Sequence, residues 1–156
     1  MFVFLVKIDS DDNNTFVIIM TMQILLFSDE KAQKHVKRII KNKPELQCLF
    51  VNRWLEETRS VKCYLSVDEK NVFSIALLTK MDFDPENIHS KPFMLDYIYT
   101  FSEYRRQKFA YKMLLYLKKK EQLSACCSNK ESGKLFETTG FAFAGYCGPT
   151  KLYRYP

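Results

Sequence analysis

Runs of strand-forming residues surround short polar turns in two parts of the chain. Each part holds two runs rich in β-branched and aromatic residues, at 2 to 8 and 16 to 27 in the first part and at 61 to 67 and 71 to 81 in the second. The segments between paired runs consist mainly of Asp, Asn, Ser, Glu and Lys. Because a short polar segment between two strand-like runs is typical of a hairpin, the sequence predicts two antiparallel β-hairpins.

The segment between the hairpins has a helical period instead. Its apolar residues recur at intervals of three or four, first at Ala32, Val36, Ile39 and Ile40 and then at Leu46, Leu49, Phe50, Trp54 and Leu55. Ser28 stands before two acidic residues, as an N-cap does, and Pro44 suits the first turn of a helix. The pattern predicts one helix after Ser28 and a second from Pro44 to about Thr58.

The second half of the chain is organised around a strand, a basic turn and a helix between Pro92 and Lys120. Strand formers fill the run from Phe93 to Phe101, and apolar residues then recur at Ala110, Met113, Leu114 and Leu117. Further strands are predicted at 123 to 128, 141 to 147 and 151 to 155, with a helix before the second of them. Strands and helices alternate here, so the sequence predicts an α/β (α+β) fold.

The basic turn of this unit suits a phosphate group. Arg105, Arg106 and Lys108 lie between the strand and the helix. The first turn of a helix offers backbone N–H groups without intrahelical acceptors and a partial positive charge, to which these side chains add full charges. The sequence therefore predicts an anion-binding site at the start of this helix.

The residues of this unit resemble the GNAT superfamily of N-acetyltransferases. In that family the central strand leads into a loop with the pattern R/Q-x-x-G-x-G/A, which holds the pyrophosphate of acetyl-CoA. The corresponding loop here is Arg105-Arg106-Gln107-Lys108-Phe109-Ala110. Ala110 fits the family pattern, whereas Lys108 stands where the family has its first glycine.

A second segment is similar to the same family. Residues 129 to 141, NKESGKLFETTGF, resemble the pattern N-x-x-A-x-x-L-Y-E-x-x-G-F in order and at the expected distance, with Phe136 in place of the frequent tyrosine. The resemblance implies a mixed, mostly antiparallel sheet of about seven strands flanked by about four helices. This sequence adds an N-terminal strand, and we expect one domain over residues 1 to 156.

The resemblance also implies the residues of a catalytic site. A carboxylate on the central strand often serves as general base in the family, and Asp96 stands at that spacing. Burial among the aromatic residues of the strand raises the pKa of such a carboxyl group toward a useful range. The alternative is that Asp96 is only a structural hydrogen-bond acceptor. Backbone N–H groups at Ile98, Tyr99 and Thr100 are expected to polarise the thioester carbonyl and pair with the pantetheine arm.

The cofactor-binding residues that the resemblance implies share two locations, the central strand with its loop and the second motif. They are Ile98, Tyr99, Thr100, Arg105, Arg106, Gln107, Lys108, Phe109, Ala110, Asn129 and Phe136. Asn129 is expected to bind the pantetheine, to cap the following helix, or to do both. Because Phe136 has no acidic proton, the departing thiolate must be protonated by solvent or by another group, with Cys126, Cys127, Ser128 and Tyr146 as candidates.

Composition narrows the classes of protein further. The 156 residues carry a formal net charge of +6 and are 47% hydrophobic, which fits a globular domain with an anionic partner such as CoA. The five cysteines include no C-x-x-C pair, which argues against a zinc site and a disulfide framework. We find no apolar run long enough for a membrane span and no signal-peptide pattern, and we expect an intracellular protein, cytoplasmic or nuclear.

The leading interpretation is an acetyl-CoA-dependent N-acetyltransferase that transfers the acetyl group directly to an amine. One alternative is a GNAT-like interaction module with weak or no activity, because both Lys108 and Phe136 depart from the family pattern. Another is nucleic-acid binding through the basic helix face from Lys31 to Lys43, for which a solvated face is the simpler interpretation. The sequence leaves open the oligomeric state. It also leaves open the acceptor, which is a protein lysine, an N-terminus or a small amine. Phe50 and Trp54 are candidates for contact with the acceptor or, alternatively, core residues.

Overall fold

The computed structural model of the chain describes the backbone of residues 2–9, 15–127 and 129–155 and, within these ranges, the side chains from Met22 onward. The strands and α-helices follow one another as β1 (Phe2–Asp9), β2 (Thr15–Ser28), α1 (Asp29–Asn42), α2 (Leu49–Leu55), β3 (Val61–Val67), β4 (Val72–Lys80), β5 (Pro92–Thr100), α3 (Phe109–Leu117), β6 (Gln122–Cys127), α4 (Lys130–Thr138), β7 (Ala142–Cys147) and β8 (Thr150–Arg154). Short 3₁₀ turns at Pro44–Leu46 and Ser102–Tyr104 precede α2 and α3. Most of the polar turn predicted between the first two strands lies outside the described residues.

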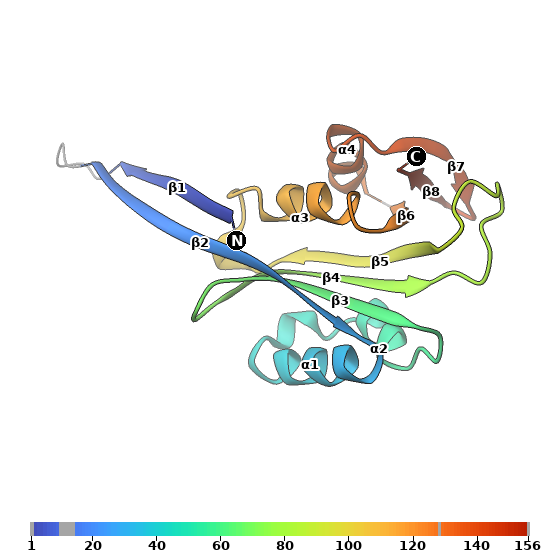
Figure 1. Ribbon diagram of the computed structural model, residues 1–156, viewed down its shortest axis with the longest axis horizontal. Helices are drawn as coiled ribbons and strands as arrows, with labels where there is room; N and C mark the ends of the chain where they lie inside the picture. Colours follow the sequence, from blue (N-terminus) through green and yellow to red (C-terminus); the bar gives the residue numbers. More distant parts are fainter. Residues whose placement is uncertain (1, 10–14, 128, 156) are drawn as a thin grey trace.

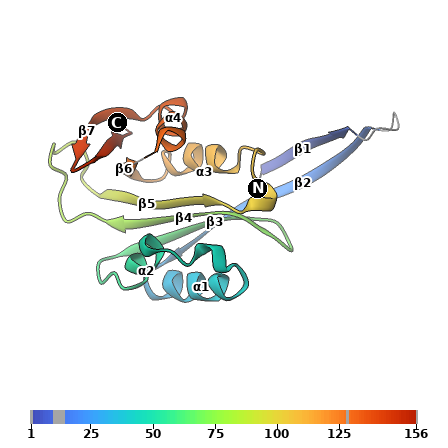
Figure 2. The ribbon, with the colours of Figure 1, turned by 180° about the vertical axis from the view of Figure 1, so that it is seen from behind.

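The strands of the described residues form one eight-stranded sheet with helices on both faces. Its order is β1-β2-β3-β4-β5-β6-β8-β7, and neighbouring strands are antiparallel except for the parallel pair β5 and β6. Helices α1 and α2 lie against one face and α3 and α4 against the other (Figure 1, Figure 2). This arrangement confirms the predicted mixed, mostly antiparallel sheet with four α-helices and an added N-terminal strand.

Strand β2 spans 14 residues and belongs to two parts of the sheet. Its first part pairs with β1, from Thr15 opposite Asp9 to Met22 opposite Phe2, and its second part, residues 23–28, pairs with β3. The β1–β2 hairpin therefore extends beyond the rest of the sheet (Figure 1). Both predicted hairpins are confirmed, since β3 also pairs with β4 in antiparallel register.

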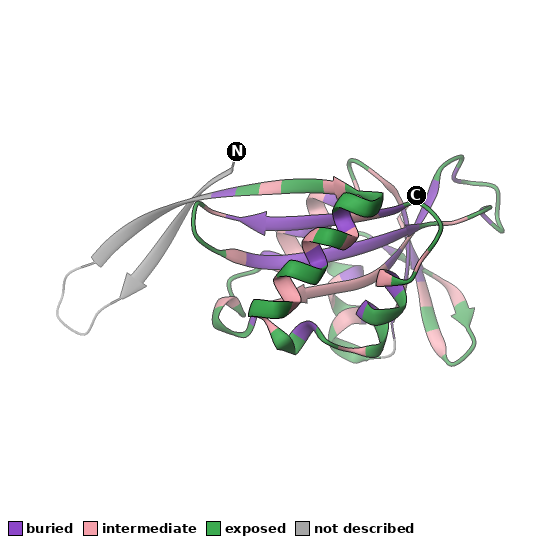
Figure 3. Ribbon diagram, turned by 90° about the horizontal axis from the view of Figure 1, so that it is seen from below, coloured by how far each residue is buried: buried purple, intermediate pink, exposed green. Residues whose placement is uncertain are grey.

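Successive side chains of the central strands belong to two apolar cores, one on each face of the sheet. Leu78 of β4 is in the core that contains Leu114 of α3, whereas its neighbour Leu77 is in the core that contains Trp54 of α2 and Val36 of α1. Strand side chains alternate between faces, so a strand covered on both faces reads as one continuous apolar run. Figure 3 shows this burial in the strands behind the exposed outer side of α1.

The second predicted helix is wrong in its length. Instead of one continuous helix, the 3₁₀ turn at Pro44–Leu46 is followed by a separate α2. Cys48 stands between them with extended φ and ψ angles of −133° and 166°. This interruption places Leu46 fully in the core. The burial of Leu46 in the tertiary structure thus decides the local conformation, although the sequence pattern predicts a continuous helix. Most short helices likewise depend on tertiary packing for their stability.

The first predicted helix is confirmed in α1, whose buried residues are Ala32 and Val36. Ser28 occupies the N-cap position, but its side chain makes no capping hydrogen bond.

All five cysteines are free thiols. In the part of the chain that the structure describes, no helix is long and apolar enough to cross a membrane.

Candidate active site

The two parallel strands at the centre of the sheet separate toward their carboxyl ends. Strands β5 and β6 pair only from Pro92 opposite Gln122 to Leu95 opposite Ala125. Beyond Leu95, β5 continues alongside β4 alone, while β6 stays paired with β8. Strand β5 therefore has a free edge toward β6 over residues 96–100, at the centre of the sheet.

Backbone N–H groups on this free edge are available to a ligand. The N–H of Phe101 donates to the carbonyl oxygen of Phe73 in β4 at 3.0 Å, one residue beyond the pair that Thr100 forms with Ser74. Because the backbone groups of successive residues point to opposite edges of a strand, the N–H groups of Ile98 and Thr100 point to the free edge and that of Tyr99 points to β4. Two of the three predicted backbone donors thus face the free edge.

Asp96 is an extra residue in β5. The register passes from Tyr97 opposite Leu77 to Leu95 opposite Leu78, so Asp96 stands opposite no residue of β4. A bulge of this kind bends the strand and re-aims the side chain of the extra residue. One carboxylate oxygen of Asp96 is buried without a hydrogen-bond partner among the described residues. The bulge thus places an acidic group with unused hydrogen-bonding capacity at the start of the free edge.

The surroundings of Asp96 shift its ionisation. Burial raises the pKa of Asp96 to about 6, although a hydrogen bond from Thr79 and the charge of Arg59 lower it and the charge of Glu57 adds to the rise. The effect of Arg59 is limited because its guanidinium donates to both carboxylate oxygens of Glu57, at 3.0 and 2.6 Å. A carboxyl group with this pKa is mostly ionised at neutral pH and suits a general base.

A cavity of about 580 Å³ lies beside Asp96 on the α2 face of the sheet. Phe50 and Trp54 of α2 form part of its wall. The indole N–H of Trp54 donates to the carbonyl oxygen of Leu78 at 3.1 Å, which fixes this wall, whereas Phe50 is 58% exposed. The polar part of the lining comes from several segments: Arg53, Glu56, Glu57, Thr58, Arg59, Thr79, Cys126, Cys147 and Thr150.

The predicted phosphate loop lies at the start of α3, on the other face of the sheet. Lys108 precedes the helix with a left-handed φ of 62°, and none of the described side chains caps the helix. The N–H groups of the first turn therefore have neither a helical nor a side-chain acceptor. Five loop residues, Arg105, Arg106, Lys108, Phe109 and Ala110, line a cavity of about 340 Å³ together with Thr100, Tyr111 and Leu135. Gln107 is exposed and does not line this cavity.

The polar groups around the loop differ in what they offer an anion. Arg105 is turned back toward β5, where it donates to the hydroxyl of Tyr99 at 2.8 Å and to the carbonyl oxygen of Thr100 at 3.4 Å. Arg106 and Lys108 are exposed. The hydroxyl of Thr100 is buried and has no hydrogen-bond partner among the described residues. The loop therefore combines two exposed cations with an unsatisfied hydroxyl and the uncapped helix start.

The second predicted motif forms the start and the buried side of α4. The side-chain oxygen of Asn129 accepts a hydrogen bond from the N–H of Ser132 at 2.8 Å, so the predicted cap is confirmed. Phe136 is 3% exposed and packs against Phe141 and Tyr153, with ring centroids 5.4 and 5.5 Å away. The structure thus places Phe136 in the core, and its contact with a cofactor stays a prediction.

Sequence reasoning missed much of the lining around Asp96. Thr79, Cys147 and Thr150 come from β4, β7 and β8 and meet only through strand pairing. Cys126 lines this cavity, whereas its neighbour Cys127 is in the core beneath α4. No local pattern marks these residues, because their proximity depends on the order and register of strands far apart in the chain.

Solved structures share the architecture of this sheet and its helices. The GNAT-family acetyltransferase from Listeria monocytogenes 4b F2365 has a TM-score of 0.58 and 15% sequence identity, over 96% of this chain and 98% of that chain. Arabidopsis thaliana NAA60, solved with acetyl-CoA, has a TM-score of 0.53 and 9% identity, over 85% of this chain and 98% of that chain.

A third similar structure is the aminoglycoside N-acetyltransferase AAC(6')-Iy in complex with CoA, with a TM-score of 0.56 and 12% identity over 82% of this chain and 92% of that chain. No family model matches the sequence, and no curated protein matches it significantly. The predicted resemblance is confirmed at the level of architecture: the chain has the fold of the GNAT superfamily of N-acetyltransferases.

Proposed function

We propose that the protein is an acetyl-CoA-dependent N-acetyltransferase that transfers the acetyl group directly to an amine. The observation that carries this proposal is the free edge of β5, where the carboxyl group of Asp96 and the N–H groups of Ile98 and Thr100 follow one another. Acetyl-CoA supplies the acetyl group as an activated thioester. The chain supplies orientation, backbone hydrogen-bond donors and a proton acceptor.

The residues around the loop fit a pyrophosphate group. The uncapped first turn of α3 provides N–H donors, and the hydroxyl of Thr100 is a buried polar group without a partner among the described residues. Arg106 and Lys108 add positive charge at the cavity that these groups share. Lys108 has a left-handed backbone conformation, which glycine adopts more readily than other residues. The loop therefore has the backbone shape that suits the family's glycine, although lysine stands at this position.

Asp96 is the proposed general base. An amine enters the cavity on the α2 face as its ammonium form and must lose a proton before it attacks a carbonyl carbon. The ionised carboxylate of Asp96 accepts that proton, directly or through a water, because its pKa of about 6 leaves it deprotonated at neutral pH. The lining holds three carboxyl groups, on Asp96, Glu56 and Glu57, against two guanidinium groups, on Arg53 and Arg59, and this excess of acidic groups favours a cationic acceptor.

Cys126 is the proposed proton donor for the departing thiolate. Of the candidates predicted from the sequence, Cys126 lines the same cavity as Asp96, Tyr146 and Cys127 line a different one, and Ser128 lies outside the described residues. Burial raises the pKa of Cys126, so its thiol carries a proton at neutral pH. Solvent is the alternative donor. Replacement of Cys126 by alanine distinguishes the two donors, because turnover falls if Cys126 supplies the proton and stays unchanged if solvent does.

The first experiment is a thermal-shift titration with acetyl-CoA, with ATP and sulfate as anion controls. A ligand present at about 100 times its dissociation constant stabilises the folded state by about 2.7 kcal/mol, which corresponds to a rise of several degrees in Tm. We expect a shift specific to acetyl-CoA that Arg106→Glu reduces. Lys119→Glu is the matched control, because it changes the net charge equally at an exposed position outside the loop.

Transfer is then measured as release of free CoA thiol with a lysine peptide, a peptide with only an N-terminal amine, and a small polyamine. Turnover with any of them supports the proposed activity and identifies the acceptor class. If acetyl-CoA binds but no acceptor yields thiol, the non-catalytic interaction module becomes the better account. Two facts about Phe136 favour this alternative: it has no phenol hydroxyl, and its ring lies in the core.

A further inference from the structure

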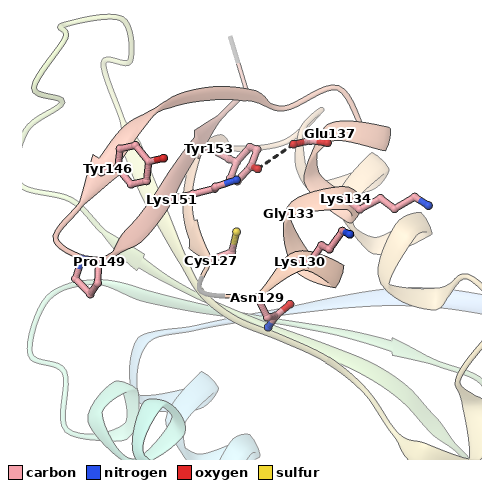
Figure 4. A pocket seen from close by; sticks show the side chains of 10 residues that line it. All are labelled: Cys127, Asn129, Lys130, Gly133, Lys134, Glu137, Tyr146, Pro149, Lys151 and Tyr153. Carbon is pink, nitrogen blue, oxygen red and sulfur yellow. Dashed lines mark hydrogen bonds between the residues drawn. The ribbon is translucent and has the colours of Figure 1, made fainter.

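A third cavity, of about 560 Å³, lies on the side of α4 that faces the β7–β8 hairpin (Figure 4). Its lining comes from the end of β6, from α4 and from the hairpin: Cys127, Asn129, Lys130, Gly133, Lys134, Glu137, Tyr146, Pro149, Lys151 and Tyr153. It shares no residue with the phosphate-loop cavity or with the Asp96 cavity. Its volume is in the range of small-molecule sites.

The charge of this cavity favours an anion. Three lysines line it, and none of the ion pairs found among the described residues involves Lys130, Lys134 or Lys151. Its one carboxylate, on Glu137, accepts a hydrogen bond from the hydroxyl of Tyr153 at 3.0 Å. The lysines of α4 extend at the rim and away from the hairpin, whereas Lys151 lies beside Tyr153 (Figure 4). Long lysine stems allow the rim charges to fold toward a ligand.

Aromatic surface lies on the hairpin side of the cavity, where Tyr146 is the strand partner of Lys151. Tyr146 is 70% exposed, and Phe143 contacts its ring edge-on, with centroids 5.3 Å apart and an interplanar angle of 77°. Phe143 is itself 51% exposed and lies 6.1 Å from the ring of Tyr153. An exposed ring held by its neighbour is a stacking surface for a flat group, and stacking on such rings next to cationic side chains is how proteins bind nucleotide units.

We propose that this cavity binds a nucleotide, with its phosphate at the three lysines and its base on Tyr146. A bare phosphate leaves most of the volume empty, and an acidic side chain does not use the aromatic wall. The amide NH₂ of Asn129 is left to donate to the ligand, because its oxygen is occupied by the helix cap. The site is separate from the phosphate loop and from the Asp96 cavity, since it shares no lining residue with either, and Asn129 is the one residue of its lining that was also predicted to bind the pantetheine.

The test is isothermal titration calorimetry of the full chain with GMP, with guanosine and inorganic phosphate as the separate parts of the ligand. We expect GMP to bind more tightly than either part and more weakly as salt increases. Lys151→Glu and Tyr146→Ala are each expected to weaken binding by about tenfold or more. Lys119→Glu, an exposed charge reversal outside the cavity, should have little effect.

Two further arms identify the location and the source of the nucleotide. If Arg106→Glu abolishes GMP binding while Lys151→Glu does not, the nucleotide binds at the phosphate loop and the proposal is overturned. A single-stranded RNA decamer that binds more tightly than GMP, and loses affinity with Tyr146→Ala, supports a nucleotide within a polymer. Tighter binding of GMP supports a free nucleotide. Equal affinities for the wild type and both cavity variants contradict the site, and Tyr146→Ala is safe for folding because the side chain is exposed.

Discussion

The hydroxyl of Thr79 lowers the pKa of Asp96 at the position where β5 carries an extra residue. The two side chains line the same cavity, although they come from different strands, β4 and β5. The Thr79 hydroxyl favours the ionised carboxylate, whereas burial favours the neutral acid, and burial is the larger effect. Thr79 is therefore a positioning residue that tunes the proposed base.

Replacement of Asp96 by asparagine should reduce turnover by about 10²-fold or more, because a positioned general base contributes on that scale. Wild-type kcat/KM should rise with pH through about 6 and level off as Asp96 ionises. The rise should disappear in Asp96→Asn, while the Kd for acetyl-CoA stays nearly the same. Initial rates of thiol release across the range around this pKa give the profile, and unchanged turnover would remove Asp96 as the base.

Thr79→Val should move the same pH profile without abolishing activity. The variant lacks the hydroxyl that stabilises the carboxylate, so the pKa of Asp96 should rise and the midpoint of the profile should shift to higher pH. A purely structural role for Thr79 predicts lower stability with an unmoved midpoint. The comparison is made on protein shown by circular dichroism to be folded over the whole pH range.

Asp96→Asn should also stabilise the fold at neutral pH. Because the pKa of Asp96 rises from 3.8 to about 6 on folding, its contribution to stability is present below about pH 4 and is lost as pH rises through 6. This difference between the folded and unfolded pKa values corresponds to about 3 kcal/mol. Urea unfolding should therefore show a gain of about 2–3 kcal/mol for the variant at neutral pH and almost none near the unfolded pKa. A gain that does not vary with pH would argue against burial of the charge.

The elements of the fold follow from local patterns, but the site depends on features that are not local. Spacing and composition predicted β5, the basic loop and α3 because these signals lie within one continuous segment. The bulge at Asp96 could not be predicted, since it arises from the pairing of β4 with β5. The direction of Phe136 was equally hidden, because its rotation into the core depends on Tyr153 near the end of the chain.

Lys108→Gly should relieve backbone strain at the start of α3. A left-handed conformation costs a residue with a side chain about 1 kcal/mol, and the greater freedom of glycine in the unfolded chain offsets a similar amount. We therefore expect Lys108→Gly to be about as stable as the wild type and Lys108→Ala to be no more stable than Lys108→Gly. Lys108→Ala should bind acetyl-CoA more weakly than the wild type because the charge is lost. Lys108→Gly should recover part of the lost affinity. Equal Kd values in all three proteins would exclude a role for this position in binding.

Phe136→Tyr tests whether the ring of Phe136 points into the core. A phenol hydroxyl at this position would enter the apolar cluster with Phe141 and Tyr153, where an unpartnered hydroxyl costs about 1–3 kcal/mol. The midpoint of urea unfolding should fall accordingly, and turnover should not rise. Phe143→Tyr is the matched control, because Phe143 is exposed and its added hydroxyl would reach solvent. Higher turnover with unchanged stability would instead show that the ring reaches the reacting sulfur, and Phe136 would then belong to the cofactor site.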